Sequence, residues 1–358
     1  MAGGFGFSVR RLLNSMMSLG ARDLGIDLGT ANTLVCVPGQ GVVLMEPSVV
    51  AVKTGSNPPV VPLDGRAVGH EAKRMIERTP ENITAIRPLK DGVIADLEIT
   101  EIMLRYFIEK VQRRAWGVRP RMVVSVPSGV TGVQKKAVKN SAINAGARRV
   151  YTVPEPKAGA IGAGLKISEP VGVMVIDIGG GTTEVGVLSL GEVVTLESLP
   201  VAGDEMDDAV ITYVRDMYGL EIGHRTAEEV KIAIGSAYPL EEEVSYEIRG
   251  TDLAPGLPRR LEISSAEIRE AISRPIHQII DAAKNCLDKT PPELASDLLN
   301  SGITLVGGGA LIPGIKELVA EETGLEVQVA DDPITAVARG TAILLEKLDE
   351  YEEVLADE

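Results

Sequence analysis

Cysteine, histidine and long apolar runs are all scarce in this sequence of 358 residues. The chain has two cysteines, Cys36 and Cys286, and both lie in apolar segments. This placement indicates buried free thiols in a reducing compartment and argues against a disulfide framework. The 3 histidines lie far apart in the sequence and lack the spacing of zinc ligands, so a zinc site is not expected. No apolar run reaches the roughly 18 residues that a membrane-spanning helix needs.

Positive charge is also in short supply, because 36 basic residues are outnumbered by 51 acidic ones and the net charge is −15. A charge of this sign argues against general binding to nucleic acid. The composition is that of a folded protein, with 44% hydrophobic residues and 38 glycines. A chain of this length is typical of two domains of ordinary size, each able to bury its own core.

Glycine is abundant in the stretch DIGGGTTEVGV, residues 177–187, which follows an apolar run. The residues after the glycines are β-branched and alternate with polar ones, so a second strand is predicted there. Nucleotide motifs of the G-x-G-x-x-G and P-loop types open a helix instead, so neither applies. The stretch therefore predicts a hairpin whose bare N–H groups and threonine hydroxyls can approach a phosphate. A plain glycine hairpin is the alternative.

The same pattern occurs a second time, because IDLGTANTLVCV at 26–37 aligns with IDIGGGTTEVGV at 176–187. Six of the twelve positions are identical, including the aspartate and the first turn glycine. Two such hairpins predict two related domains that face one ligand and bind its phosphates from both sides. Asp27 and Asp177 would hold the accompanying Mg²⁺, through water because this ion keeps several waters. The alternative role for each aspartate is to form a turn at a strand end.

A third glycine cluster lies in ITLVGGGALIPGIKELVAEETG, residues 303–324, which predicts a strand, a loop and a helix. Pro313 fits the first turn of that helix, and Gly324 fits the position just after its end. The bare backbone at 307–309 would let a flat, bulky group such as an adenosine lie against the chain. The alternative is a tight connection between the strand and the helix.

Strands and helices alternate elsewhere, which favours mixed α/β sheets. Residues 119–129 predict a strand that ends in a turn, and residues 133–150 a helix that ends at Gly146 before the next strand. Residues 266–290 predict a helix, and ITLV is predicted as the strand that follows it. Two segments, about 53–80 and about 203–262, are interpreted as smaller inserted subdomains at the rim of the cleft.

The paired IDLGTANT and IDIGGGTTE hairpins with the later GGGA loop resemble the actin, Hsp70 and sugar-kinase ATPase superfamily. The segments ARDLGIDLGTANTLV, RPLKDGVIAD, VAGDEMDDAV, IRGTDLAPGLPR and KTPPELASDLL are similar to the MreB family of bacterial actin homologues. The resemblance implies an actin-like ATPase fold, in which two related α/β domains, each with a mixed sheet and a small inserted subdomain, surround a cleft for ATP and Mg²⁺. Domain I would comprise residues 21–160 plus 335–358, and domain II residues 161–334.

The family resemblance also implies a function. It implies a weak ATPase whose activity is coupled to polymerisation into filaments that direct cell-wall synthesis and rod shape in bacteria. The implied partners are the chain itself, a cell-wall synthesis complex and an adaptor protein.

The resemblance assigns roles to individual residues. The nucleotide-binding residues that it implies are Thr30, Ala31 and Asn32 in the first phosphate loop, Gly179, Gly180 and Gly181 in the second, Gly307, Gly308, Gly309 and Ala310 in the adenosine loop, and Glu228, Glu229, Val230 and Lys231 in a nucleotide-contacting helix. Glu155 is similar to the family's water-positioning residue, with a solvated loop carboxylate as the alternative, and Thr182 is a second candidate for orienting water. Glu228 and Lys231 could instead form an ion pair on a helix surface. Gly159 replaces the usual alanine, which would loosen the local helix by about 0.5–1 kcal/mol.

The N-terminal segment 1–20 has the pattern of an amphipathic, basic helix. Its predicted membrane-facing side chains are Phe5, Phe7, Val9, Leu12, Leu13, Met16 and Met17. Apolar residues at this spacing share one helical face, and the two arginines at 10 and 11 lie off it. This pattern predicts peripheral binding to an anionic membrane. The alternatives are a helix packed on the protein's own core or a signal peptide, although polar residues interrupt any apolar core of such a peptide.

A second segment, KVQRRAWGVRPR at 110–121, surrounds the single tryptophan, Trp116, with basic residues and no acidic one. Tryptophan favours the headgroup region and basic residues favour anionic lipid, so this segment predicts a second membrane contact. A buried tryptophan with a solvated basic rim is the alternative. Both segments together predict a cytoplasmic protein that is peripheral on the inner face of the cell membrane.

Two other activities are compatible with the same loops. A sugar or carboxylate kinase would need a substrate pocket and a catalytic base across the cleft. An Hsp70-like chaperone would need a separate peptide-binding domain after the ATPase, and the residues after the adenosine loop are too few for one.

Overall fold

The computed structural model describes residues 22–112, 119–254 and 256–348. Its first large sheet has five strands in the order β3-β2-β1-β8-β9. Their bounds are β1 Leu24–Leu28, β2 Asn32–Val37, β3 Gly41–Pro47, β8 Arg121–Val126 and β9 Arg149–Pro154. The central strand β1 runs antiparallel to β2 and parallel to β8.

The second large sheet repeats this plan with the order β12-β11-β10-β16-β17. Its strands are β10 Val173–Ile178, β11 Thr183–Ser189, β12 Glu192–Leu199, β16 Ile303–Val306 and β17 Val327–Val329. Here β10 takes the place of β1, antiparallel to β11 and parallel to β16. The equal order and directions confirm the two related α/β domains predicted from the repeated hairpins.

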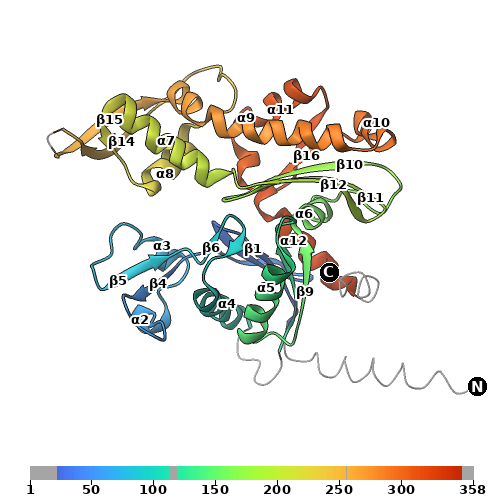
Figure 1. Cartoon of the computed structure of the whole chain (residues 1–358), viewed down its shortest axis with the longest axis horizontal. Helices are drawn as coiled ribbons and strands as arrows, with labels where there is room; N and C mark the ends of the chain where they lie inside the picture. The colour runs from blue at the N-terminus through green and yellow to red at the C-terminus, as the bar shows by residue number, and fades with distance from the viewer. Residues whose placement is uncertain (1–21, 113–118, 255, 349–358) are drawn as a thin grey trace, which may run out of the picture.

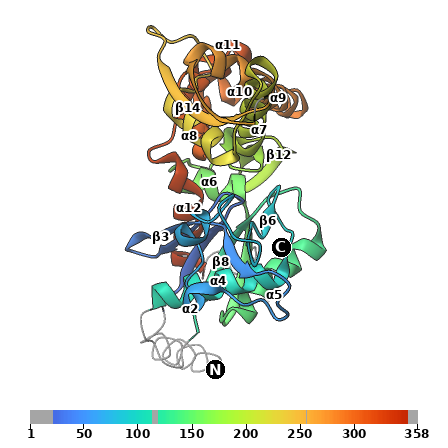
Figure 2. The same ribbon diagram turned by 90° about the vertical axis from the view of Figure 1, so that its left-hand side faces the viewer.

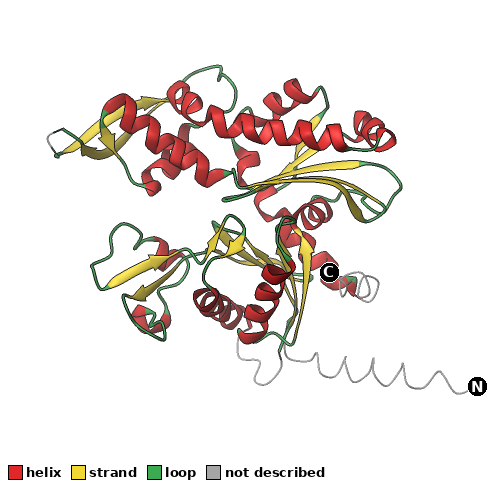
Figure 3. Ribbon diagram, viewed as in Figure 1, coloured by secondary structure: helices red, strands yellow, loops and turns green. Residues whose placement is uncertain are grey.

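Helices cover both sheets (Figure 1, Figure 3). Around the first sheet lie α4 Leu97–Gln112, α5 Gly132–Asn144 and α12 Ala336–Glu346, and around the second lie α6 Glu155–Gly162, α7 Gly203–Tyr218, α9 Ser265–Lys289, α10 Pro292–Ser301 and α11 Ile315–Thr323. Every residue of β10 is buried, because helices cover both faces of its sheet, and the strand VMVIDI is accordingly an almost continuous apolar run.

Helices α6 and α12 lie between the two halves (Figure 1, Figure 2) and pack closely on each other. Two glycines allow this approach. A methyl carbon at Gly162 would lie 1.7 Å from the carbonyl oxygen of Ala336, and one at Gly340 would lie 1.8 Å from that of Ala158. Backbone therefore meets backbone where the two halves join, and neither glycine leaves room for a side chain.

Smaller elements extend from each half. Near the first sheet, β4 Val50–Lys53 pairs with β5 Ile83–Ile86, with α2 Pro62–Gly65 and α3 His70–Lys73 between them, and β6 Leu89–Lys90 pairs with β7 Val93–Ile94. Near the second, β13 Leu220–Glu221, β14 Ser245–Asp252 and β15 Pro258–Ser264 form one sheet beside α8 His224–Ile234. Two short 3-10 turns, η1 Gly308–Leu311 and η2 Pro333–Thr335, complete the elements of the described residues.

Several local predictions can be compared with this structure. The two hairpins, the strand within 119–129 and the helix that ends before Gly146 are confirmed, and Gly146 has a φ of +122°. ITLV is the next strand after the long helix, as predicted, and α10 lies between the two, beginning at Pro292, a position that suits proline. Pro313 precedes α11 instead of lying in its first turn, whereas Gly324 ends that helix in the left-handed conformation, as predicted.

No helix among the described residues is long and apolar enough to cross a membrane.

Candidate functional site

A cavity of about 370 Å³ lies between the two halves. Most residues predicted to bind nucleotide or metal line it together: Asp27, Thr30, Ala31, Asn32, Glu155, Asp177, Gly179, Gly180, Gly181, Thr182, Glu228, Lys231, Gly307, Gly308 and Gly309. Three predicted residues, Glu229, Val230 and Ala310, are not among its lining. Val230 is fully buried in the core, Ala310 is buried, and Glu229 forms an ion pair with Arg225 at 2.8 Å.

The two glycine-containing hairpins meet head to head at one end of this cavity. A methyl carbon at Gly180 would lie 2.6 Å from the Cβ atom of Ala31, and one at Gly181 would lie 2.9 Å from Thr30 Oγ1. Thr30 Oγ1 also accepts a hydrogen bond from the backbone N–H of Gly92 at 3.0 Å. The turns β1–β2 and β10–β11 thus border the same space from opposite sides, as expected of a phosphate clamp.

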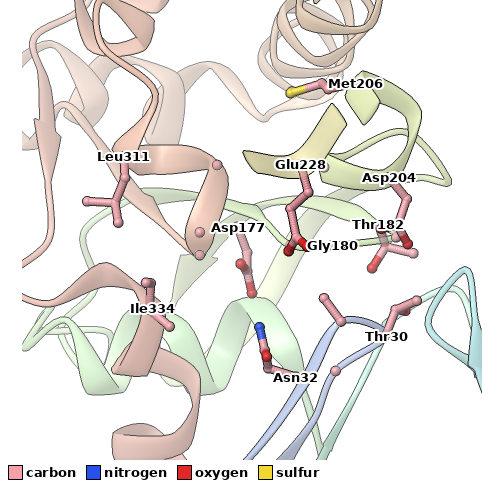
Figure 4. A pocket seen from close by; sticks show the side chains of 18 of the residues that line it. Thr30, Asn32, Asp177, Gly180, Thr182, Asp204, Met206, Glu228, Leu311 and Ile334 are labelled. Atoms are coloured by element: carbon pink, nitrogen blue, oxygen red, sulfur yellow. The ribbon is translucent and has the colours of Figure 1, made fainter. Parts of the chain in front are cut away.

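The third glycine loop borders the cavity from the second half. Gly307 has a φ of +82°, and a methyl carbon there would lie 2.4 Å from Asp177 Oδ1, so only glycine fits beside the carboxylate. Leu311 and Ile334 add apolar surface away from the phosphate clamp, and Figure 4 shows both across the cavity from Thr30 and Thr182. The cavity therefore has a polar end and an apolar end, which suits the phosphates and the base of a nucleotide.

Helix α8 contributes two charged side chains, but they do not pair with each other as the surface alternative required. Glu228 pairs at 2.7 Å with Lys73 of α3, an element of the other half. Lys231 pairs with Asp207 of α7 at 2.8 Å and donates a hydrogen bond to the carbonyl oxygen of Gly203 at 2.8 Å. Both side chains are thereby held at the cavity wall by partners far away in the sequence.

None of the site residues predicted from the sequence lies in the N-terminal turn of α7, although this turn borders the cavity. Gly203, Asp204, Met206 and Asp207 all line the cavity. The N–H of Asp204 donates to the carbonyl oxygen of Gly180 at 2.7 Å, so this helix begins directly on the second phosphate hairpin. In the sequence, this turn belongs to the segment VAGDEMDDAV, which resembles the MreB family but in which no binding residue was predicted.

Two carboxylates of the cavity, Asp177 and Glu155, are buried and a third, Asp27, is partly buried, and this burial raises their pKa values. Burial raises the pKa of Asp27 to about 6, an effect opposed by the Ser125 hydroxyl, which donates to Asp27 Oδ1 at 2.9 Å. Burial and the charges of Asp27 and Glu184 raise the pKa of Asp177 from the usual 3.8 to about 8. The pKa of Glu155 is also raised well above its usual value, first by burial and then by Asp177. Such a set of buried carboxylates favours a bound cation.

The arrangement of these carboxylates suits a water-mediated ion. Among the described residues, no three histidine, cysteine or acidic side chains converge on one direct metal position. Asp27 and Asp177 lie on equivalent strands and both line the cavity. This donor set fits Mg²⁺, which typically uses one or two carboxylates together with waters and substrate phosphates.

Glu155 is the first residue of α6 and is only 8% exposed, so it is not the solvated loop carboxylate considered as its alternative. Lys157, in the same helix, is 1% exposed and pairs with Glu192 of β12 at 3.0 Å. A methyl carbon at Gly159 would lie 3.2 Å from Val306 Cγ2. The helix that carries Glu155 is thus packed tightly against the second sheet.

The predicted membrane residues in 1–20 and Trp116 lie outside the described residues. Three basic residues of the segment 110–121 are described: Arg119 is exposed, and the other two have acidic partners from elsewhere in the chain. Lys110 pairs with Glu46 at 2.5 Å, and Arg121 pairs with Asp23 at 2.6 Å. The segment has no acidic residue of its own, but the fold brings an acidic partner to each of these two side chains.

The duplicated sheets, the facing hairpins and the carboxylates around a nucleotide-sized cavity define an actin-like nucleotide-binding protein. A family model described as MreB/Mbl protein matches residues 21–353. The cell shape-determining protein MreB of Escherichia coli (strain K12) is 51% identical over 342 residues, which cover 94% of this chain and 97% of that relative. The cell shape-determining protein Mbl of Bacillus subtilis (strain 168) is 47% identical over 329 residues, 92% and 97% of the two chains.

Solved structures agree. The crystal structure of MreB5 of Spiroplasma citri bound to AMPPNP superimposes with a TM-score of 0.86 at 38% identity and covers 93% of this chain and 98% of that chain. A MamK double helical filament, at 24% identity and a TM-score of 0.74, shares the fold. The chain therefore belongs to the MreB/Mbl family, as the sequence predicted, and is a cytoskeletal, polymerising, actin-like ATPase.

Proposed function

We propose that the cavity binds ATP with its phosphates between the two hairpins and its adenosine against the loop at 307–309. The observation that supports this most directly is the close approach of Gly180 and Gly181 to Ala31 and Thr30, because it brings glycine-containing turns of both halves together at the cavity. The MreB5 structure bound to AMPPNP, a relative of the same fold, supports the same ligand class. Glu228 and Lys231 would border the ribose or the base.

Mg²⁺ would be held by Asp27 and Asp177 through water, and it would neutralise the phosphate charge. Glu155 would position the attacking water, since its side chain enters the cavity from the first turn of α6. Thr182, at the end of the second hairpin, would orient the same water from the other side. Of these groups, only Glu155 and Thr182 would contribute specifically to hydrolysis, because the others serve to bind the nucleotide.

The experiment that tests these roles separates binding from turnover. Glu155→Gln keeps the size of the side chain and removes its charge, so nucleotide affinity should stay within about threefold. Phosphate release in a single turnover should slow by about 10²-fold or more, as for loss of a positioned general base. If the variant releases phosphate at the wild-type rate, Glu155 does not position the attacking water. ATP-dependent phosphorylation of a small alcohol by the wild-type protein would instead support the kinase alternative.

Membrane binding is proposed for the face from which residues 1–21 and 113–118 leave the described structure. The N–H of Arg22 donates to Gln112 Oε1 at 3.1 Å, and Gln112 Nε2 donates to the Arg22 carbonyl oxygen at 2.7 Å. The flanks of both predicted membrane segments therefore lie side by side. The exposed basic residues Arg119 and Arg148 lie close by, because the N–H of Arg148 donates to the carbonyl oxygen of Pro120.

This proposal places the chain at the inner face of the cell membrane as a peripheral protein, with a cell-wall synthesis complex and an adaptor as further partners. Deletion of residues 1–20 should abolish flotation with anionic liposomes, and Trp116→Ala should weaken it. Filament formation without lipid, followed by electron microscopy, is the control that the deletion variant still folds. Unchanged flotation of the deletion variant would overturn the N-terminal anchor.

The division of the chain into functional domains is also a proposal. Residues 21–160 plus 335–358 would move as one body and 161–334 as the other, with smaller subdomains at about 53–80 and 203–262. The separate buried clusters around the two five-stranded sheets support this division.

A further inference from the structure

Glu184 is a buried carboxylate that does not line the cavity and has no role in the proposed mechanism. It is the second residue of β11 and is only 1% exposed. A carboxylate in such a position is costly unless both of its oxygens have partners. Both do, and the partners come from two different parts of the chain.

The first partner belongs to the other half of the molecule. Glu184 Oε2 accepts a hydrogen bond from the backbone N–H of Ser128 at 2.9 Å. Ser128 lies in the loop between β8 and α5 of the first half, whereas β11 belongs to the second sheet. The second partner is the hydroxyl of Ser198 on β12, which donates to Glu184 Oε1 and lies opposite Glu184 in the strand register. Glu184 thus joins the 127–131 loop of the first half to two strands of the second.

Glu184 also lies between the two residues proposed to handle the attacking water. Alternate residues of a strand share a face, so Glu184 and Gly186 lie on the same side of β11. Pro156 packs there, because a methyl carbon at Gly186 would lie 3.0 Å from Pro156 Cβ, and Pro156 follows Glu155 directly. In the other direction along the chain, Thr182 precedes Glu184 by two residues.

The loop that Glu184 holds reaches the phosphate clamp as well. A methyl carbon at Gly92 would lie 2.4 Å from Pro127 Cγ and 3.2 Å from Thr182 Cγ2. The N–H of Gly92 donates to Thr30 Oγ1. Ser128 and its neighbour Pro127 therefore lie against a group of residues that touches both hairpins, and a shift of this loop would shift their relative position.

We propose that Glu184 is a positioning residue for ATP hydrolysis, which sets Thr182 and Glu155 relative to the terminal phosphate by fastening the 127–131 loop to β11. This inference rests on the roles proposed for Glu155 and Thr182. It assigns Glu184 no contact with the nucleotide, and it therefore predicts a loss of turnover without a matching loss of nucleotide affinity. Displacements of about 1 Å can lower a rate by about 10²-fold.

The test compares three variants by single-turnover hydrolysis, nucleotide affinity and thermal melting. Glu184→Ala should slow hydrolysis by about 10- to 100-fold while the affinity for AMPPNP changes by less than about threefold. Glu184→Gln should hydrolyse within about threefold of wild type, because its amide can accept from Ser128 and donate to Ser198. Glu197→Ala is the matched control on β12, since Glu197 pairs with Lys289 at the surface; its hydrolysis should be unchanged.

Each result decides the question. Wild-type hydrolysis by Glu184→Ala would overturn the proposal, and so would a parallel loss of affinity and turnover, which indicates a merely structural role. A Glu184→Gln variant as slow as Glu184→Ala would overturn the hydrogen-bond argument. If Glu184→Ala cannot be purified, Glu184→Asp replaces it, because its shorter side chain cannot reach both partners. If the Glu155→Gln variant hydrolyses ATP as fast as the wild-type protein, the proposed role of Glu155 fails. That result does not depend on Glu184.

Discussion

The contact between α6 and α12 gives the prediction that the structure specifies most closely. Gly162→Ala would place a methyl carbon 1.7 Å from the carbonyl oxygen of Ala336 and 2.8 Å from the backbone nitrogen of Gly340. Ordinary contacts of a Cβ atom begin at 3.4 Å, so the helices would have to separate by well over an ångström. The obstructing atoms are backbone, and no side chain can rotate away to relieve the clash.

The cost can be estimated from overpacking in other cores. Inserted methyl groups usually cost about 1–3 kcal/mol, and the helix-forming gain of alanine over glycine returns about 0.5–1 kcal/mol. Since backbone meets backbone here, we expect a cost at the upper end of this range and a net destabilisation of about 2–2.5 kcal/mol. Each kcal/mol lowers the melting temperature by about 2–4 °C in a domain of 150–250 residues, so a decrease of roughly 4–10 °C follows.

Differential scanning calorimetry of the nucleotide-free protein measures this change. Gly132→Ala is the control, because it also adds a methyl group to a helix but meets no atom within 4 Å. A Gly162→Ala variant that melts within about 1 °C of wild type would refute the close approach of the two helices. Hydrolysis should fall together with stability, because α6 carries Glu155.

Four other perturbations have definite expected outcomes. Gly159→Ala should leave the melting temperature within about 2 °C of wild type, because the added methyl group meets only side-chain atoms, Val306 Cγ2 at 3.2 Å and Val337 Cγ2 at 3.6 Å; a large decrease would contradict this. Asp177→Asn should abolish Mg²⁺-dependent nucleotide binding, measured by isothermal titration calorimetry with and without EDTA; undiminished binding with Mg²⁺ would rule out its metal role. Because the folded protein raises the pKa of Asp177 to about 8, the native state holds more protons than the unfolded state between about pH 4 and 8, and stability falls as pH rises through that window. The melting temperature of nucleotide-free Asp177→Asn should therefore depend less on pH than that of wild type, and an equal pH dependence would argue against the raised pKa. Lys73→Ala should accelerate the release of a fluorescent nucleotide by about 2- to 5-fold, since its partly exposed pair with Glu228 joins the two halves and is worth up to about 1 kcal/mol. Arg74→Ala, whose partner Glu71 lies three residues away in the same half, should not change the release rate. Equal release rates for both variants would mean that the Lys73–Glu228 pair does not help to retain the nucleotide.

Local sequence patterns predicted a large part of this protein. The glycines after Asp27 and Asp177 and the β-branched residues beyond them mark hairpins, because turn geometry and strand propensity depend on neighbouring residues. The repetition of the pattern implied two related sheets around one ligand, and both sheets have the same strand order. The family could likewise be recognised from motifs along the chain.

Errors occurred where one local pattern fits two structures. Pro313 was predicted to lie in the first turn of a helix, yet α11 begins only at Ile315. Within the predicted nucleotide-contacting helix, Glu228 reaches the cavity whereas Val230 lies in the core, because successive residues of a helix point in different directions.

Other properties were decided only by tertiary structure, because they depend on groups that are far apart in the sequence. No local pattern indicates that Glu228 pairs with Lys73, or that Glu184 accepts a hydrogen bond from Ser128. The raised pKa of Asp177 results from burial under both halves and from carboxylates on other strands. The sequence by itself determined which short elements form and which ligand chemistry they suit, whereas folding determined which side chains meet, since burial and charge act through space and not along the chain.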